Sequence, residues 1–74
     1  MFYMKHLKTF ELIEAVMRAG SIRKAAEDTN LTASALNRRI QSFEQEFGWT
    51  IFERMPRGMR LNPAGELLMQ HIRS

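Results

Sequence analysis

Apolar residues recur along this chain at the spacing of an α-helix. The most regular segment runs from Thr32 to Phe47, where they fall at i, i+4, i+7 and i+11 and form one stripe of a helix. These residues are Leu36, Ile40, Phe43 and Phe47. Thr32 is a suitable N-cap, and the pair Phe47-Gly48 ends the helix.

Two shorter helical segments precede this one. The first helix is predicted from about Lys5 to Arg18, and Gly20 suits the left-handed backbone position that follows a helix. The second helix is predicted from Ile22 to about Asp28, with Ser21 as its N-cap. Its small residues, Ala25 and Ala26, allow another helix to approach closely.

The second and third helices are joined by a sharp turn at residues 29–31. Asn30 tolerates the positive φ that a tight turn needs, and Leu31 is expected to seal the turn. In a helix-turn-helix, the second helix of the pair braces the third, whose N-terminal end is then free to enter a groove of DNA. The order of these elements indicates that arrangement.

A short β-hairpin and a last helix complete the pattern. Strands are predicted at Ile51–Arg54 and Met59–Leu61, joined by Met55–Gly58, whose proline and glycine positions suit a type I turn. Asn62 then caps an amphipathic helix that begins at Pro63. The predicted fold is therefore mainly α, a winged helix-turn-helix with a three-helix core, a two-stranded β-hairpin wing and the start of a C-terminal helix.

Composition fits one small globular domain. The chain has 74 residues, and 45% of them are hydrophobic. It has no cysteine, so disulfides and thiolate metal sites are excluded. No apolar run reaches the ~20 residues that span a bilayer. We therefore expect a cytoplasmic protein without a membrane partner.

The charge of the chain suits a nucleic-acid partner. The net charge is +3 and the pI about 10.0, which is typical of a nucleic-acid-binding domain. Basic residues gather in the middle of the chain, at Arg23, Lys24, Arg38, Arg39, Arg54, Arg57 and Arg60. Glu44 and Glu46 lie late in the third helix. The N-terminal half of that helix is therefore its basic half.

The polar face of the third helix is predicted to contact bases in a major groove about 12 Å wide. Side chains that reach base edges must come from its first two turns, at Ala33, Ser34, Asn37 and Arg38. Arginine can bind guanine O6 and N7 together, and asparagine can bind adenine N6 and N7. Arg39 lies nearer the apolar stripe and can instead pair with an acid.

Further residues are candidates for contacts with the DNA backbone or for the wing. They are Ser21, Arg23, Thr32, Gln41, Arg57 and Arg60. Ser21 can cap its helix or help to hold a phosphate at that helix N-terminus. Arg57, at the hairpin tip, can contact the backbone or minor groove, or lie in a solvated turn. Arg54 is interpreted as structural, paired with a carboxylate, and Trp49 is expected to close the core beside the wing.

Enzyme chemistry and metal binding find little support in this chain. His6 and His71 are far apart, with no ligand spacing between them. Nothing resembles a nucleophile elbow or a pair of catalytic carboxylates. We therefore expect no enzyme activity, no cofactor and no metal.

Several segments in this order and spacing resemble the N-terminal DNA-binding domain of LysR-type transcriptional regulators, from about Leu7 to Ile72. They are LKTF, GSIRKAA, SALNRRI, FEQEFG, IFER and RLNPAGE. The resemblance implies a bacterial transcription factor that binds double-stranded DNA as a homodimer or a dimer of dimers. It also implies a C-terminal effector-binding domain, absent from this chain, that takes a small molecule.

The resemblance also assigns parts of this chain. Residues 1–62 would be the DNA-binding domain, and residues 63–74 the start of a linker helix that dimerises. The residues expected to dimerise are Leu67, Leu68 and Ile72. The recognition helix corresponds to Thr32–Phe47, and the wing to Met55–Leu61.

Three positions depart from the family pattern. Ala33 stands where a glutamine is usual and offers only a methyl group, which can contact thymine but cannot donate or accept. Asn37 replaces the usual serine, and Thr29 replaces an apolar residue, so the turn is expected to pack less well. These changes leave the fold prediction intact and the recognised DNA sequence open.

Other functions remain possible on the sequence alone. A winged helix of another regulator family, or an architectural DNA binder without strong sequence preference, has the same general pattern. A protein-interaction module would instead use the Pro63 helix as its working surface. In that case replacing Leu68 and Ile72 would abolish function, whereas a DNA binder would depend on Asn37 and Arg38.

Overall fold

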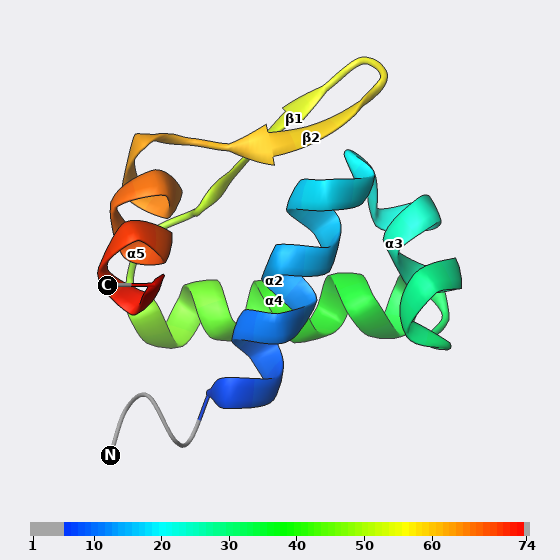
Figure 1. Ribbon diagram of the computed structural model, residues 1–74, viewed down its shortest axis with the longest axis horizontal. Helices are drawn as coiled ribbons and strands as arrows, with labels where there is room; N and C mark the ends of the chain where they lie inside the picture. Colours follow the sequence, from blue (N-terminus) through cyan, green and yellow to red (C-terminus); the bar gives the residue numbers. More distant parts are fainter. Residues whose placement is uncertain (1–5, 74) are drawn as a thin grey trace.

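A computed structural model describes residues 6–73 of the chain. Its elements in chain order are α2 (Leu7–Ala19), α3 (Ile22–Thr29), α4 (Ala33–Phe47), β1 (Phe52–Met55), β2 (Gly58–Leu61) and α5 (Pro63–Arg73). Figure 1 shows α2 crossing α4, with α3 near the start of α4 and α5 near its end. The predicted order of helices and hairpin is confirmed. The predicted start of the first helix at Lys5 lies outside the described residues.

Local signals fix the ends of the helices as the sequence predicts. The side-chain oxygens of Ser21, Thr32 and Asn62 each accept a backbone N–H from the first turn of their helix, at 2.8–3.1 Å. Gly20 and Asn30 end the first two helices in left-handed conformations, with φ of 83° and 60°. Each cap satisfies a backbone group that a helix end would otherwise leave unpaired.

The core lies between α2, α3 and α4 and extends to β1 and α5. Its fully buried side chains include Leu12, Ile13, Val16, Ala25, Leu36, Ile40 and Ile51. The apolar stripe of α4 is buried as predicted at Leu36, Ile40 and Phe43, while Phe47 is half-buried at the edge. Burial of this stripe leaves the opposite face of α4 to solvent.

The turn between α3 and α4 closes differently from the prediction. Leu31 is 37% exposed, so the expectation that its side chain seals the turn is wrong. The backbone closes the turn instead, because the Leu31 N–H donates to the Ala26 carbonyl oxygen at 3.1 Å. Half-buried Thr29 packs in place of an apolar residue, and its hydroxyl donates to the Ala25 carbonyl at 2.9 Å.

The wing is a two-stranded antiparallel hairpin with Phe52 opposite Leu61 and Met55 opposite Gly58. Each strand extends one residue further toward the hairpin tip than predicted, so that β1 ends at Met55 and β2 begins at Gly58. The hairpin is fixed to the helices by its backbone, since the Met59 N–H donates to the Gly20 carbonyl oxygen at 2.9 Å.

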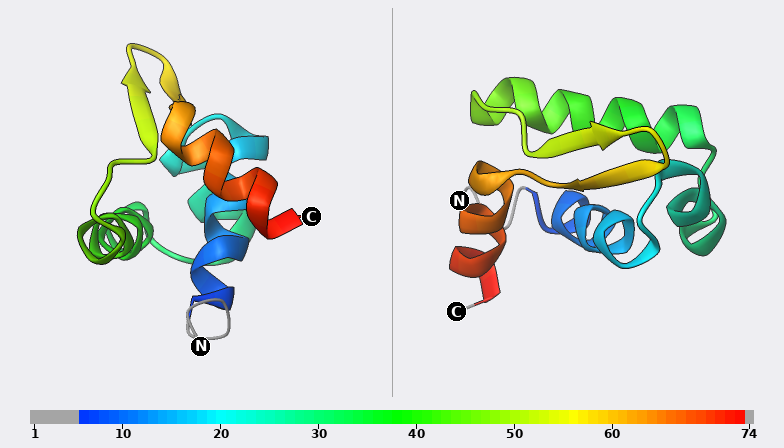
Figure 2. Two further views of the ribbon diagram at one scale, coloured as in Figure 1. Left: turned by 90° about the vertical axis from the view of Figure 1, so that its left-hand side faces the viewer. Right: turned by 90° about the horizontal axis from the view of Figure 1, so that it is seen from above.

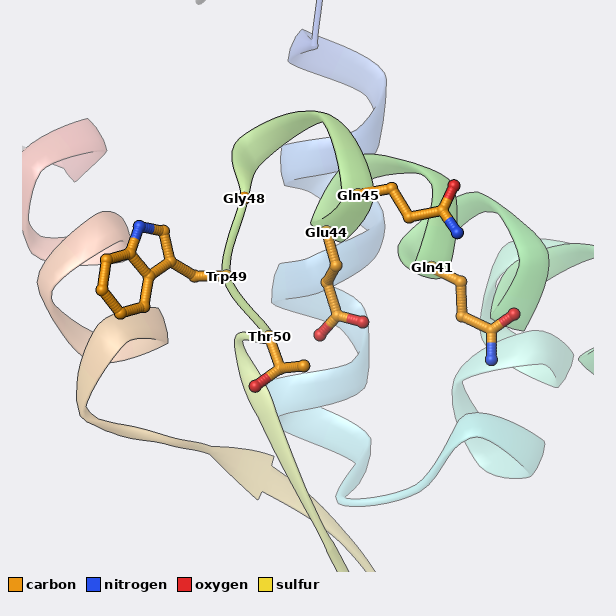
Figure 3. Close-up of a pocket in the computed structure, with 6 residues that line it drawn as sticks. All are labelled: Gln41, Glu44, Gln45, Gly48, Trp49 and Thr50. Carbon is orange, nitrogen blue, oxygen red and sulfur yellow. The ribbon is translucent and has the colours of Figure 1, made fainter.

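Trp49 lies outside the core. It is 66% exposed, so the expectation that it closes the core beside the wing is wrong. Ile51 occupies the buried position, and its carbonyl oxygen accepts the Asn62 N–H at 2.9 Å. Because Ile51 is held there, the loop that leads to it stays outside, and Figure 3 shows the indole ring turned away from Glu44.

Candidate nucleic-acid interface

The exposed face of α4 and the wing lie on one side of the molecule. In the left-hand view of Figure 2, α4 is seen end-on and the hairpin rises on the same side, with α5 on the other. Packing of the apolar stripe against α2 and α3 dictates which face of α4 looks outward. This face and the wing together could contact one extended partner.

The structure brings the predicted base-contacting residues together in the first two turns of α4. Ala33, Ser34 and Arg38 are exposed, and Asn37 is half-buried. Gln41 follows one turn later and is also exposed. These residues form a surface rich in hydrogen-bond donors and without acidic residues at the N-terminal end of α4. The helix macrodipole is positive at this end, so the surface favours an anionic partner.

The residues predicted to contact phosphate flank this surface. The hydroxyls of Ser21 and Thr32 accept cap hydrogen bonds, and each keeps its own proton for a further acceptor. Arg23 is exposed in the first turn of α3, and Arg57 is exposed at the wing tip. These groups are donors, as a phosphate oxygen requires.

Arg60 is engaged within the wing. Its Nη2 lies 3.5 Å from Oε1 of Glu53, the residue opposite it in the hairpin. Both side chains are exposed, and exposed pairs contribute only about 0–1 kcal/mol. A phosphate could therefore compete with Glu53 for this guanidinium at little cost.

Arg54 has a different partner from the carboxylate expected for it. Its Nη2 donates to Oδ1 of Asn37 at 3.0 Å, which joins β1 to α4. Side chains of a β-strand point alternately to its two faces, so residues two apart share a face. This alternation was a signal for the contact, because Phe52, two residues before Arg54, is buried against the helices. Arg54 shares that face of the strand.

Glu44 has a structural contact that sequence reasoning missed. Its Oε2 accepts the backbone N–H of Ile51 at 2.7 Å. Figure 3 shows this carboxylate beside an open hollow of about 520 Å³ at the end of α4. The hollow is lined by Gln41, Glu44, Gln45, Gly48, Trp49 and Thr50. Glu44 thus holds the loop that leads into the wing.

The residues predicted for dimerisation do not share one exposed face. Leu68 is buried at 9% exposure and Ile72 packs partly against the core, whereas Leu67 is 69% exposed. Leu67 borders an apolar groove of about 520 Å³ together with exposed Trp49. The rest of the groove is lined by Phe47, Pro63, Ala64, Leu68 and His71.

Neither a metal cluster nor a membrane helix is found within the described range. Among residues 6–73, no group of three or more histidine, cysteine, aspartate or glutamate side chains could hold a metal ion. Over the same residues, no helix is long and apolar enough to cross a bilayer. His6 packs against Phe43, and its Nε2 lies 3.3 Å from Oε1 of Glu46.

Known proteins of one family resemble this chain in sequence. The model of the lysR family of bacterial regulatory helix-turn-helix proteins matches residues 6–66. The uncharacterized HTH-type transcriptional regulator y4mQ of Sinorhizobium fredii is 40% identical over 65 residues, which cover 88% of this chain and 22% of that protein. The HTH-type transcriptional regulator MetR of Escherichia coli K12 is 37% identical over 70 residues, covering 95% and 21%. The chain thus spans about a fifth of these relatives.

Solved structures of the same family share the fold. The CbnR DBD–DNA complex matches with a TM-score of 0.82 and 27% identity, over 89% of this chain and 76% of that one. The BenM DBD in its complex with benA site 1 DNA matches with a TM-score of 0.81 and 31% identity, over 88% and 73%. The winged helix-turn-helix predicted from the sequence is confirmed. The relatives are named as transcriptional regulators, not as enzymes, and this chain belongs to the lysR family of bacterial regulatory helix-turn-helix proteins.

Proposed function

We propose that this domain binds double-stranded DNA sequence-specifically and serves transcription regulation. The N-terminal half of α4 enters the major groove, and the wing lies at the backbone or the minor groove. The observation that carries the proposal is the position of the exposed face of α4 beside the wing, on one side of the molecule. Relatives of the same fold were solved in complexes with DNA.

In this proposal the contacts divide into two kinds. Ser34, Asn37 and Arg38 contact base edges, and the methyl group of Ala33 can pack against a thymine methyl. Contacts with the sugar-phosphate backbone of the DNA come from Ser21, Arg23, Thr32, Gln41, Arg57 and Arg60. Backbone contacts supply affinity and position, whereas base contacts supply the sequence preference.

The test is to select preferred duplexes from random DNA with the 74-residue chain, and then to measure binding of the Arg38→Ala variant. We expect this variant to lose about 1–3 kcal/mol of binding free energy for the selected duplex and its preference at one base pair. Lys8→Ala removes an equal charge from the exposed start of α2 and should leave that preference intact. An equal loss on all sequences would make Arg38 a phosphate contact.

The remaining family features belong to the same proposal. Because the chain spans about a fifth of its relatives, a C-terminal domain that binds a small-molecule effector is assigned to the rest of the protein. Residues 1–62 are then the DNA-binding domain, and residues 63–74 begin the linker helix. A regulator of a bacterial chromosome works in the cytoplasm, so this location is part of the proposal.

Self-association through α5 is supported by one specific observation. Exposed Leu67 and Trp49 border the same apolar groove, and apolar surface of this kind is favourably buried against another chain. We place the homodimer contact at this groove, with Leu67 and Trp49 as its main apolar contacts, because the core already buries most of the Leu68 side chain. Two copies would then bind two half-sites, separated by about one helical turn of DNA or a multiple of it.

A further inference from the structure

One side-chain hydrogen bond connects the wing to the recognition helix. Arg54 in β1 donates from Nη2 to Oδ1 of Asn37, in the second turn of α4, at 3.0 Å. Its Nη1 lies 3.9 Å from the sulfur of Met59, the residue opposite it in β2. The bond therefore joins two elements of the proposed DNA-binding surface.

The bond determines how the carboxamide of Asn37 is turned. A carboxamide accepts hydrogen bonds at its oxygen and donates them from its nitrogen, whereas a guanidinium only donates. Arg54 can therefore bond only the oxygen, which it holds toward β1. The two amide N–H groups and the second lone pair of Oδ1 remain for another partner.

An orientation fixed in this way has consequences for recognition of DNA. Each base pair presents its own order of donors and acceptors in the major groove. A freely rotating carboxamide could exchange the positions of its donor and acceptor, and so could hydrogen-bond with more than one kind of base pair. Once Arg54 holds its oxygen, Asn37 can match fewer kinds of base pair, and its side chain loses less conformational entropy when it binds DNA.

We propose that Arg54 is a positioning residue for sequence recognition, which holds the Asn37 carboxamide in one orientation and so sharpens the preference for one base pair. The proposal rests on the function proposed above and adds to it a residue that touches no base. It also gives a role to the asparagine that replaces the usual serine at this position.

The charge of Arg54 suggests an alternative role, a direct contact with a DNA phosphate, which must be distinguished from the positioning of Asn37. None of the ion pairs described for residues 6–73 involves Arg54, so its charge could also attract a phosphate. Phosphate contacts carry no sequence information. Loss of such a contact would weaken all duplexes alike, whereas loss of positioning would alter the preference at a single base pair.

The experiment uses the duplex selected by the 74-residue chain and its single-base-pair variants. Binding is measured for the wild type, Asn37→Ser, Arg54→Ala and the double variant. The base pair whose preference disappears in Asn37→Ser is the one that Asn37 contacts. A good contact discriminates there by roughly 5- to 150-fold. We expect Arg54→Ala to lose most of that discrimination, and to have no further effect on it when Asn37→Ser is present.

The matched control is Arg60→Ala, which removes the same charge from the facing strand of the same hairpin. It should weaken all duplexes alike and keep the preference at the Asn37 position. Should Arg54→Ala fail to fold, Arg54→Gln replaces it, because glutamine both donates and accepts and cannot dictate one orientation.

Two outcomes would overturn the inference. If Arg54→Ala behaves like Arg60→Ala, with a uniform loss and an intact preference, Arg54 is a phosphate contact and only this inference fails. If the wild type itself prefers no duplex, the proposed function fails and this inference fails with it.

Discussion

At the scale of single residues, Glu44 shows how a side chain outside the proposed DNA contacts can position them. It lies in the last turns of α4, and its carboxylate accepts the N–H of Ile51 at 2.7 Å. Ile51 is fully buried directly before β1. The same bond therefore satisfies a backbone group and sets where the wing begins relative to the recognition helix.

Replacing Glu44 with alanine should lower the free energy of unfolding by about 1.5–3 kcal/mol, because hydrogen bonds to charged groups contribute that much. Chemical denaturation measures the loss. Gln45→Ala is the control, since its side chain is exposed on the same turn, and it should stay within about 0.5 kcal/mol of the wild type. Equal stability of the two variants would show that the Glu44 bond is unimportant.

At the scale of elements, the wing is held by close backbone contact with the helices. The Met59 N–H donates to the Gly20 carbonyl oxygen at the end of α2. Gly58, with φ of 152°, lies so close that a Cβ at its position would clash with the same carbonyl oxygen. Glycine is needed here both for its backbone conformation and for the approach of the hairpin.

Gly58→Ala should therefore destabilise the domain more than Gly48→Ala. Both positions have positive φ, which costs an alanine of order 1–3 kcal/mol, but nothing lies within 4 Å of a Cβ at Gly48. The melting temperatures of the two variants make the comparison. A Gly58→Ala variant as stable as Gly48→Ala would mean that the wing moves aside without cost.

At the scale of the whole molecule, the sequence predicted what local signals encode. The caps at Ser21, Thr32 and Asn62 depend on a side chain and the turn beside it, so they could be recognised in the chain alone. The exposure of Trp49 could not be recognised from the chain alone, because it depends on which residue of the loop fills the core. The bond between Arg54 and Asn37 likewise exists only once β1 lies beside α4.

The proposed homodimer also concerns the molecule as a whole, and a substitution in the apolar groove tests it. Leu67→Glu should raise the dissociation constant of self-association at least about ten-fold, because a carboxylate would have to be buried in the apolar groove. Sedimentation equilibrium measures the change. Leu31→Glu, at an exposed leucine of the turn between α3 and α4, serves as the control. A dimer unaffected by Leu67→Glu, or a wild type that stays monomeric, would contradict the use of this groove.

The central claim is that the surface formed by α4 and the wing binds DNA, and salt dependence tests it most directly. Fluorescence anisotropy on an arbitrary labelled duplex, between about 50 and 200 mM salt, measures the affinity. If ~4 phosphates are neutralised, the log–log slope should be near −3.6, a loss of roughly 150-fold over that range. An Arg57→Ala/Arg60→Ala double variant, which removes two of the proposed contacts with the DNA backbone, should weaken this binding and make the slope shallower. Absence of binding at 50 mM salt, or binding that the double variant keeps unchanged, would contradict the account.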